Sequence, residues 1–245
     1  MTSAASLDVR SVAHSLLEKA MPQVAALQSP RAWVYSILGL CGEACPISGK
    51  TQARILMREL ADRLRNLYMA NASSTWKWFE PYASYDNARI SQAMLVAGQT
   101  FDDSELTEIG LDSLNWLHEA QVGTASVFSP IGCDEVWHRG KPKPQFDQQP
   151  LEAWAMVDAC LVASKLDSTR PWTERAQVAL EWFFGRNDRS LALADSVTGG
   201  CHDGLQHDRV NENQGAESTL AYLGAITEHL HHGQEENWTL TGVVR

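Results

Sequence analysis

Three carboxylates recur at equivalent positions of an internal repeat. The segment YDNARISQAMLVAG aligns without a gap with FDQQPLEAWAMVDA, at an offset of 61 residues. The later segment NENQGAESTLAYLG aligns with the second copy at an offset of 65 residues. The carboxylates that share one position of this repeat are Asp86, Asp147 and Glu212.

Acids placed in this way could perform acid–base chemistry. Carboxylates that lie close together and are partly desolvated have their pKa values pushed apart, so a general acid and a general base can coexist near neutral pH. The candidate catalytic residues are Asp86, Asp147, Asp203 and Glu212, with Glu80 and Glu135 behind them. In the alternative interpretation, each acid only caps its helix by accepting hydrogen bonds from the free N–H groups of the first turn.

Long connections ahead of the repeat copies add aromatic, basic and amide side chains. Loops of this length within a compact helical domain are more often functional than idle. Tryptophan rings stack on the apolar face of a sugar while paired polar groups hold its hydroxyls. We therefore expect an oligosaccharide ligand. The candidate substrate-binding residues are Trp76, Trp78, Glu80, Tyr85, Asn87, Trp137, Arg139, Gln148, Gln149, His202, Asn213 and Gln214.

The elements that position these residues are predicted to be helices. Apolar residues recur at the helical period in about eight segments, and no segment shows the sustained alternation that strands require. One stripe contains Val12 and Leu16, and another contains Leu220, Leu223 and Leu230. The predicted helices lie around 12–20, 32–42, 53–69, 87–98, 104–120, 150–164, 172–185 and 216–230. The sequence therefore predicts an all-α fold.

The predicted helices are of two kinds. Charged amphipathic helices alternate with helices rich in Ala, Gly, Ser and Met, as expected when outer and inner helices form hairpins in a ring or arc. We expect a single domain over residues 1–245, an (α/α) toroid or open arc of about four hairpins. Its N-terminal hairpins would lie in 1–75 and its repeat region, with the site, in 76–230. An irregular helical bundle is the alternative.

Three segments of the repeat region resemble a known domain family. They are WKWFEPYASYDNARISQAML, SPIGCDEVWHRG followed by FDQQPLEAWAMVDA, and GRNDRSLALADSVTGGCHDGLQHDRVNENQGAESTLAYL. Over roughly Trp76 to Leu230 they are similar to the α/α-hairpin domain of bacterial proteins described as glycosyltransferases. That domain resembles the six-hairpin glycosidase toroids, which include inverting glycoside hydrolases and sugar 2-epimerases. The resemblance implies activity on, or binding of, a carbohydrate.

Two carbohydrate-related functions follow from the acids and the resemblance. The first is a glycoside hydrolase, in which a protonated carboxyl and a carboxylate would stand about 6.5 to 9.5 Å apart if the enzyme inverts. The second is a non-catalytic glycan-binding or accessory domain of a separate glycosyltransferase module. In that case Arg89, Arg139 or Arg209 would neutralise the acids. The phosphate-binding glycine loop of a nucleotide-sugar module is missing from the sequence.

Cysteines and histidines suggest a third function, a zinc-dependent toroid enzyme. Cys201 and His202 resemble the ligand pair of such toroids, with Cys133 in the preceding loop, but these residues form no metal-ligand spacing motif. We therefore expect neither a metal nor another cofactor. Cys41 and Cys45 are predicted to be buried small residues. The run His229, His231 and His232 is predicted to form a solvated tail after the last helix.

Composition limits the partners and the compartment. The net charge of -10 argues against binding of nucleic acid or an anionic membrane surface. Five irregularly spaced cysteines favour a reducing cytoplasm over a disulfide framework. The sequence shows neither a secretory leader nor an apolar run long enough to span a membrane, so we expect a cytoplasmic protein without membrane contact.

Overall fold

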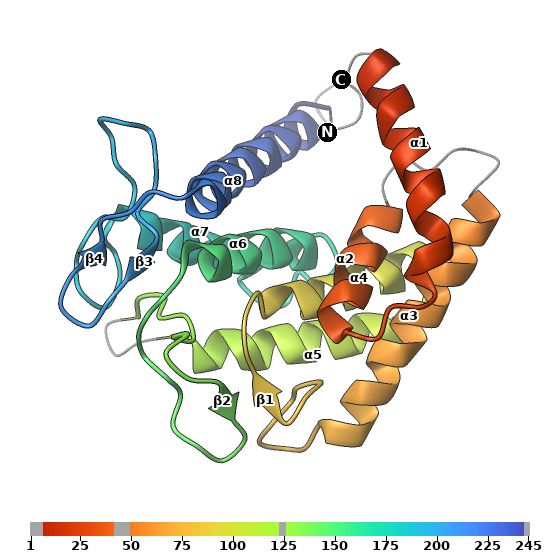
Figure 1. Cartoon of the computed structure of the whole chain (residues 1–245), viewed down its shortest axis with the longest axis horizontal. Coiled ribbons are helices and arrows are strands. Elements are labelled where there is room, and N and C mark those ends of the chain that lie inside the picture. Colours follow the sequence, from red (N-terminus) through yellow and green to blue (C-terminus); the bar gives the residue numbers. More distant parts are fainter. Residues whose placement is uncertain (1–6, 42–49, 123–125, 243–245) are drawn as a thin grey trace. The chain divides into compact units, whose positions relative to one another are not determined.

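The computed structural model describes residues 7–41, 50–122 and 126–242, and these are mostly helical (Figure 1). The all-α class predicted from the helical periodicity is confirmed. The α-helices within the described ranges are α1 (Leu7–Val24), α2 (Pro30–Leu40), α3 (Lys50–Asn71), α4 (Ala88–Phe101), α5 (Ser104–Ala120), α6 (Pro150–Ser164), α7 (Trp172–Glu181) and α8 (Ala216–Gly242). A 3₁₀ turn, η2 (Trp182–Phe184), extends α7.

Two short antiparallel ribbons lie in the long connections ahead of α4, α6 and α8. In the first, β1 (Tyr82–Ala83) pairs with β2 (Trp137–His138). In the second, β3 (Gly204–Leu205) pairs with β4 (Val210–Asn211). The connections that the sequence suggested would carry the site are therefore partly ordered by backbone pairing.

Contacts along the backbone divide the chain into two compact units. Unit 1 takes its residues from Met1–Phe79 and Ala93–Asp112, and unit 2 from Glu80–Gln92 and Ser113–Arg245. Trp76 and Trp78 belong to unit 1, whereas every other predicted site residue belongs to unit 2. The candidate site must therefore be assembled within unit 2.

Unit 1 is built around one face of α3. Leu56, Leu60 and Leu64 are buried there, and α3 packs against α2, which buries Val34 and Ile37. The apolar stripe of α1 behaves differently from the prediction, because Val12 and Leu16 are 60% and 61% exposed. The expectation that this stripe faces the core is wrong in the described part of the chain, where it faces solvent.

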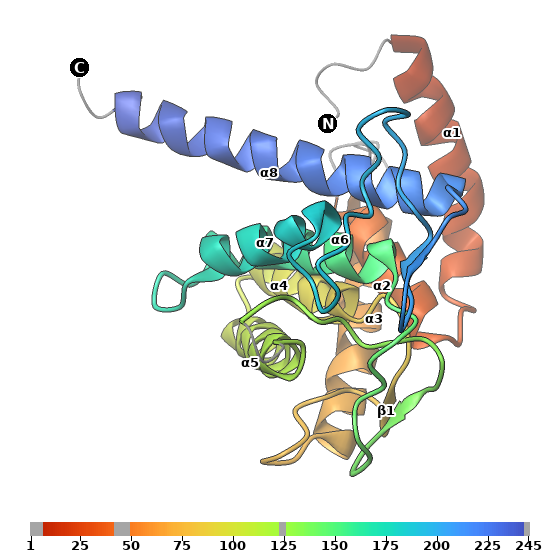
Figure 2. The same cartoon turned by 90° about the vertical axis from the view of Figure 1, so that its left-hand side faces the viewer.

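Unit 2 is organised by α6, whose side chains are buried nearly all round the helix. A helix that is apolar on all sides is expected to be covered on all sides, and α6 contacts both α7 and α8. Figure 2 shows α8 running across α6 and α7. The inner position predicted for the 150–164 helix matches this burial.

The face of α8 that packs on α6 is made of small residues and not of the leucine stripe that follows the helical period. Leu220, Leu223 and Leu230 are 62%, 47% and 58% exposed, whereas Ala221 and Ala225 are buried. The physical reason is close approach of the two helices. A Cβ atom placed on Gly224 would lie 2.6 Å from Cε2 of Trp154 in α6, so only a glycine fits beneath that ring.

Two smaller predictions are also corrected. The histidine run lies inside α8 instead of following it, and His232 is buried. Cys41 is exposed at the end of α2, where the chain leaves the helix, whereas Cys45 falls outside the described residues. Among the helices described, none is both long enough and apolar enough to cross a membrane.

Candidate functional site

Backbone pairing brings the chain entering α6 beside the β3–β4 ribbon. The N–H of Gln148 donates to the carbonyl of Leu205 (2.9 Å), and the N–H of Leu205 donates back to the carbonyl of Gln148 (2.8 Å). On its other edge, β3 pairs Gly204 with Asn211 of β4. Three strand-like segments therefore lie side by side, and they carry the predicted acids Asp147, Asp203 and Glu212.

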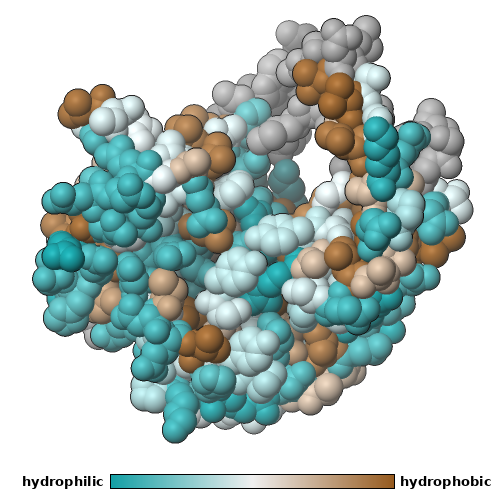
Figure 3. Space-filling model, in the orientation of Figure 1, coloured by the Kyte–Doolittle hydropathy of each residue, from teal (hydrophilic) through white to brown (hydrophobic). Residues whose placement is uncertain are grey.

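A hollow of about 330 Å³ lies on this ribbon. The surrounding surface is mainly hydrophilic (Figure 3). The hollow combines one guanidinium, one carboxylate and two amides around a single aliphatic side chain. Its lining residues are Gln206, Arg209, Val210, Asn211 and Glu212. Of the predicted catalytic residues, Glu212 is thus the one that lines it.

A chain of side-chain contacts leads from the hollow to Asp147. The hairpin closes when the N–H of Gln206 donates to the carbonyl of Arg209 (2.8 Å). The Nε of Arg209 then donates to Oε1 of Gln206 (2.9 Å). The side chain of Gln206 also lowers the pKa of Asp147, against the effect of burial. Gln206 therefore orients the guanidinium and influences the charge of the acid.

Asp147 is held in an environment that favours its protonated form. Burial raises its pKa, the negative charge of Asp134 adds to the rise, and the hydrogen bond from Gln206 opposes it. Its Oδ1 is buried and accepts no hydrogen bond from any part of the chain that the structure describes. A Cβ atom on Gly204 would lie 2.7 Å from this oxygen, so the glycine makes room for the carboxyl.

Asp203 has the opposite character. Burial acts to raise its pKa, but hydrogen bonds from Asn213, Ser218 and the backbone of Gly215 outweigh it, so the pKa is lowered. The N–H of Gly215 lies 2.7 Å from Oδ1, directly before α8. This geometry matches the capping interpretation, in which the acid stabilises the start of a helix. The predicted partner Asn213 donates to the second oxygen of Asp203.

Asp86 lies between β1 and α4, shortly before the helix begins. It is buried, and its Oδ1 is 3.9 Å from Nε of Arg89. Arg89 also forms an ion pair with Asp158 and covers the ring of Trp154 at 4.5 Å. A buried carboxylate paired with a buried guanidinium is what the accessory-domain interpretation predicted for the acids.

The two amide side chains at the start of the second repeat copy form hydrogen bonds with other groups of the protein. Gln148 is fully buried, and its Nε2 donates to the carbonyl of Gln145 (2.8 Å) and to Asp188 (2.5 Å). Its Oε1 accepts a hydrogen bond from Nε1 of Trp182 (2.9 Å). Both ends of the amide that was predicted to bind substrate are therefore engaged inside unit 2, and Gln148 has no exposed surface. The neighbouring Gln149 donates to Sγ of Cys133 (3.2 Å).

The predicted aromatic residues fall into different environments. Trp76 and Trp78 are 3% and 0% exposed in unit 1, so they are core residues whose rings cannot stack on a ligand. Trp137 is half-buried and stacks on Trp116, with ring centroids 5.5 Å apart and planes at 5°. Tyr85 is 49% exposed.

The other predicted site residues of unit 2 also lie in different environments. Arg139 is exposed and Glu80 is buried, near the β1–β2 ribbon. Gln214 bridges a loop to the start of α8, donating to Asp195 (2.9 Å) and accepting from Thr198 (2.9 Å). Nδ1 of His202 is buried and has no hydrogen-bond partner among the described residues.

The zinc interpretation finds no supporting geometry in the described ranges. Cys201 is buried, and burial raises the pKa of its thiol to about 12, which disfavours the thiolate that zinc binds. Burial, together with the charges of Asp147 and Asp134, raises the pKa of Cys133. Over residues 7–41, 50–122 and 126–242, no group of three or more His, Cys, Asp or Glu side chains could hold a metal ion.

Two comparisons with known proteins find no relative of this chain. The chain matches no protein-family model. A search of curated proteins likewise finds no match.

Gln206 and Asn211 line the hollow but were not predicted as site residues. The repeat alignment begins at Asn211 and so leaves out Gln206 and the first strand of the ribbon. The available signal was the segment GLQHDRVN, in which two short apolar stretches flank a polar turn, as in a hairpin.

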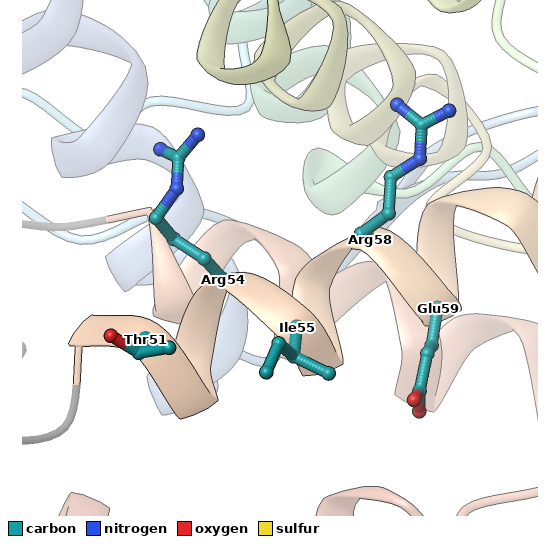
Figure 4. Close-up of a pocket in the computed structure, with 5 residues that line it drawn as sticks. All are labelled: Thr51, Arg54, Ile55, Arg58 and Glu59. Atoms are coloured by element: carbon teal, nitrogen blue, oxygen red, sulfur yellow. The ribbon is translucent and has the colours of Figure 1, made fainter.

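A second hollow, of about 470 Å³, lies along α3 in unit 1 (Figure 4). It is lined by Thr51, Arg54, Ile55, Arg58 and Glu59. The side chains of Arg54 and Arg58 project in the same direction, and both guanidinium groups lie near the ring of Phe101, at 5.0 and 5.5 Å. Arg58 also pairs with Asp103 at 2.7 Å, so this hollow is lined by cations that already have partners.

Proposed function

We propose that this chain binds a carbohydrate in the hollow of the β3–β4 ribbon. The observation that carries the proposal is the lining, in which Gln206, Arg209, Asn211 and Glu212 surround one cavity. A sugar ring presents several hydroxyls that both donate and accept hydrogen bonds, and amide, guanidinium and carboxylate groups complement them.

The polar groups of the hollow are held in place before any ligand arrives. Backbone pairing fixes Asn211 opposite Gly204, and the Gln206 amide orients the Arg209 guanidinium. Groups that are already ordered lose little conformational entropy on binding, which supports useful affinity in a shallow site.

Binding without hydrolysis is the function that the acids favour. Asp86 is buried beside Arg89, and Asp203 is engaged by hydrogen bonds from the chain entering α8. An inverting hydrolase needs a pair of free carboxylates that face one cleft. Two of the four candidate catalytic residues are therefore already engaged by other groups of the protein.

Hydrolysis of a glycosidic bond is the second candidate, favoured by Asp147. A raised pKa suits a general acid, and Gln206 links Asp147 to the hollow in which Glu212 lies. In this version Asp147 would protonate the leaving oxygen and Glu212 would activate water.

We also propose that unit 2 forms part of an arc of helical hairpins of the six-hairpin glycosidase type. The inner position of α6, in contact with both α7 and α8, supports this arrangement. The site would then lie among the connections that lead into the inner helices, as in the family that the sequence resembles.

The test is a binding screen of the whole chain against gluco- and manno-oligosaccharides by calorimetry. Asn211→Ala and Glu212→Gln should each weaken binding by roughly tenfold, about 1.4 kcal/mol, because each removes groups that hold hydroxyls. Glu174→Gln, an exposed acid of α7 away from the hollow, is the matched control and should bind as the parent does. Unchanged affinity in both hollow variants would refute the proposal.

The same samples separate binding from hydrolysis. Release of reducing sugar by the parent chain, abolished in Asp147→Asn, would establish the hydrolase. Binding without release, retained in Asp147→Asn, would establish a non-catalytic glycan-binding domain.

A further inference from the structure

Arg209 offers two unused donor groups to the hollow. Its Nε donates to Gln206, but neither terminal nitrogen forms a hydrogen bond or ion pair within the part of the chain that the structure describes. The side chain is exposed at the hairpin and lines the cavity. An oriented guanidinium with a free edge is prepared to bind two oxygen atoms at once.

Neighbouring acids do not occupy this edge. Glu212 lines the same hollow, yet the structure places no ion pair between it and Arg209 in the described ranges. Asp203 already accepts hydrogen bonds from Asn213 and from the N–H of Gly215. The hollow therefore carries a cation and an anion that remain separate from each other.

We infer that Arg209 binds the acidic group of the sugar, so that the ligand of this hollow is an anionic carbohydrate. The inference rests on the proposed function and specifies its ligand. The acidic group is a carboxylate or a phosphate ester, held by both terminal nitrogens of Arg209. Asn211 and Glu212 hold hydroxyls of the same ligand.

Charge-assisted pairing favours an oxyanion over a neutral diol at this position. A guanidinium and a carboxylate or phosphate form two parallel hydrogen bonds that are each about twice as strong as neutral ones. The net charge of -10 opposes the approach of an anion, but charges beyond about 8 Å are largely screened at physiological ionic strength. Contact with Arg209 therefore dominates over the long-range repulsion.

The experiment measures calorimetric affinities of the whole chain for four probes. These are a neutral gluco-oligosaccharide, a glucuronic-acid oligosaccharide of the same length, a phosphorylated gluco-oligosaccharide and inorganic phosphate. We expect one acidic oligosaccharide to bind roughly tenfold or more tightly than the neutral one, with the preference falling as salt is added. The two acidic probes distinguish a carboxylate from a phosphate ester.

Three variants connect the preference to Arg209. Arg209→Gln should abolish the preference, so that the acidic and the neutral oligosaccharide bind to this variant with affinities within about twofold of each other. Arg209→Lys keeps the positive charge but lacks the planar guanidinium, and it should retain only part of the preference for the acidic oligosaccharide. Arg186→Gln, which removes an exposed arginine paired with Glu181 in the same unit, should leave the preference for the acidic oligosaccharide unchanged. Circular dichroism checks that each variant is folded.

The outcomes are separable. Equal affinity for neutral and acidic oligosaccharides, or an acid preference that survives in Arg209→Gln, overturns the inference and leaves the proposed function standing. Inorganic phosphate binding as tightly as the preferred acidic oligosaccharide also overturns it, because the sugar would then contribute nothing. Binding of no oligosaccharide at all removes the proposed function and the inference together.

Discussion

Asn87 and Glu152 join the beginnings of α4 and α6. The backbone N–H of Asn87 donates to Oε2 of Glu152 (3.3 Å), and its side-chain amide lies 3.2 Å from both carboxylate oxygens. Both side chains are buried. Two copies of the internal repeat are therefore connected through a carboxylate in the first turn of one helix and an amide directly ahead of the other.

Replacing Asn87 with alanine should destabilise the fold by about 2 to 3 kcal/mol, because a buried carboxylate would lose the side-chain amide that lies within hydrogen-bond distance of both its oxygens. Urea denaturation of the parent, Asn87→Ala, Glu152→Gln and the double variant measures this effect. The double variant should be less destabilised than the sum of the single ones.

A matched control for the Asn87 series is available on α7. Gln177 also donates to a carboxylate, that of Glu181 (2.9 Å), but it is partly exposed. Gln177→Ala should therefore cost less than about 1 kcal/mol. Equal losses in Asn87→Ala and Gln177→Ala would show that burial of the pair contributes nothing.

Gly204→Ala should disturb the ribbon and the hollow together. The added Cβ would lie 2.7 Å from Oδ1 of Asp147 and 3.0 Å from the carbonyl oxygen of Gln148, so the strands must separate. We expect a loss of about 1 to 3 kcal/mol in stability, and weaker binding of oligosaccharide. Thermal unfolding and calorimetry measure the two effects.

Gly39→Ala in α2 is the control for this glycine substitution. No neighbouring atom lies within 4 Å of its added Cβ, and the residue is inside a helix. This variant should be more stable than the parent by about 0.5 to 1 kcal/mol. Destabilisation by Gly39→Ala, or full stability in Gly204→Ala, would contradict the steric argument.

The helices could be predicted from the sequence because their burial follows the 3.6-residue period. Leu56, Leu60 and Leu64 of α3 and Met156 of α6 are buried as that period requires. The prediction failed where two helices approach closely. On α8 the period selected leucines, but contact with α6 is made by alanine and glycine beneath Trp154. Residue size at the contact, which periodicity ignores, decides which face is buried.

The site was predictable in position but less so in composition. The repeat alignment selected Asp147 and Glu212, which the structure places on adjoining segments at the β3–β4 ribbon. It could not separate them from Asp86, whose pairing with Arg89 depends on tertiary contacts. It also missed Gln206, because a side chain that orients Arg209 and contacts Asp147 is defined by strand register, which no repeat reveals.

His118 of α5 should make the fold sensitive to acid. Burial, assisted by the positive charge of Arg175, lowers the pKa of His118 to about 4, whereas in the unfolded chain it is near 6.5. Between these values the unfolded chain binds the additional proton, so stability falls as the pH is lowered from 6.5 towards 4. The loss should approach about 3 kcal/mol over that window.

Chemical denaturation at a series of pH values measures this loss. His118→Gln should flatten the profile between pH 6.5 and 4, since glutamine does not titrate. His138→Gln, at an exposed histidine of the same unit, is the control and should keep the parental slope. A steep profile that persists in His118→Gln would assign the acid sensitivity to other groups.

Asp147 and Asp203 should respond in opposite directions to the same substitution. The pKa of Asp203 is lowered in the fold, so its charged form stabilises the protein at neutral pH and that contribution is lost as the pH falls through its folded pKa. Asp203→Asn should therefore lower stability at pH 7 by about 1 to 2 kcal/mol. The pKa of Asp147 is raised, so its charged form costs stability at neutral pH, and Asp147→Asn should leave stability unchanged or increase it.

Urea denaturation of both variants at pH 7 and near pH 3 provides the measurement, and the difference between them should shrink at the lower pH as both carboxyls gain protons. Stabilities that shift together at pH 7 would mean that the hydrogen bonds of Asp203 and the burial of Asp147 do not set their charge states.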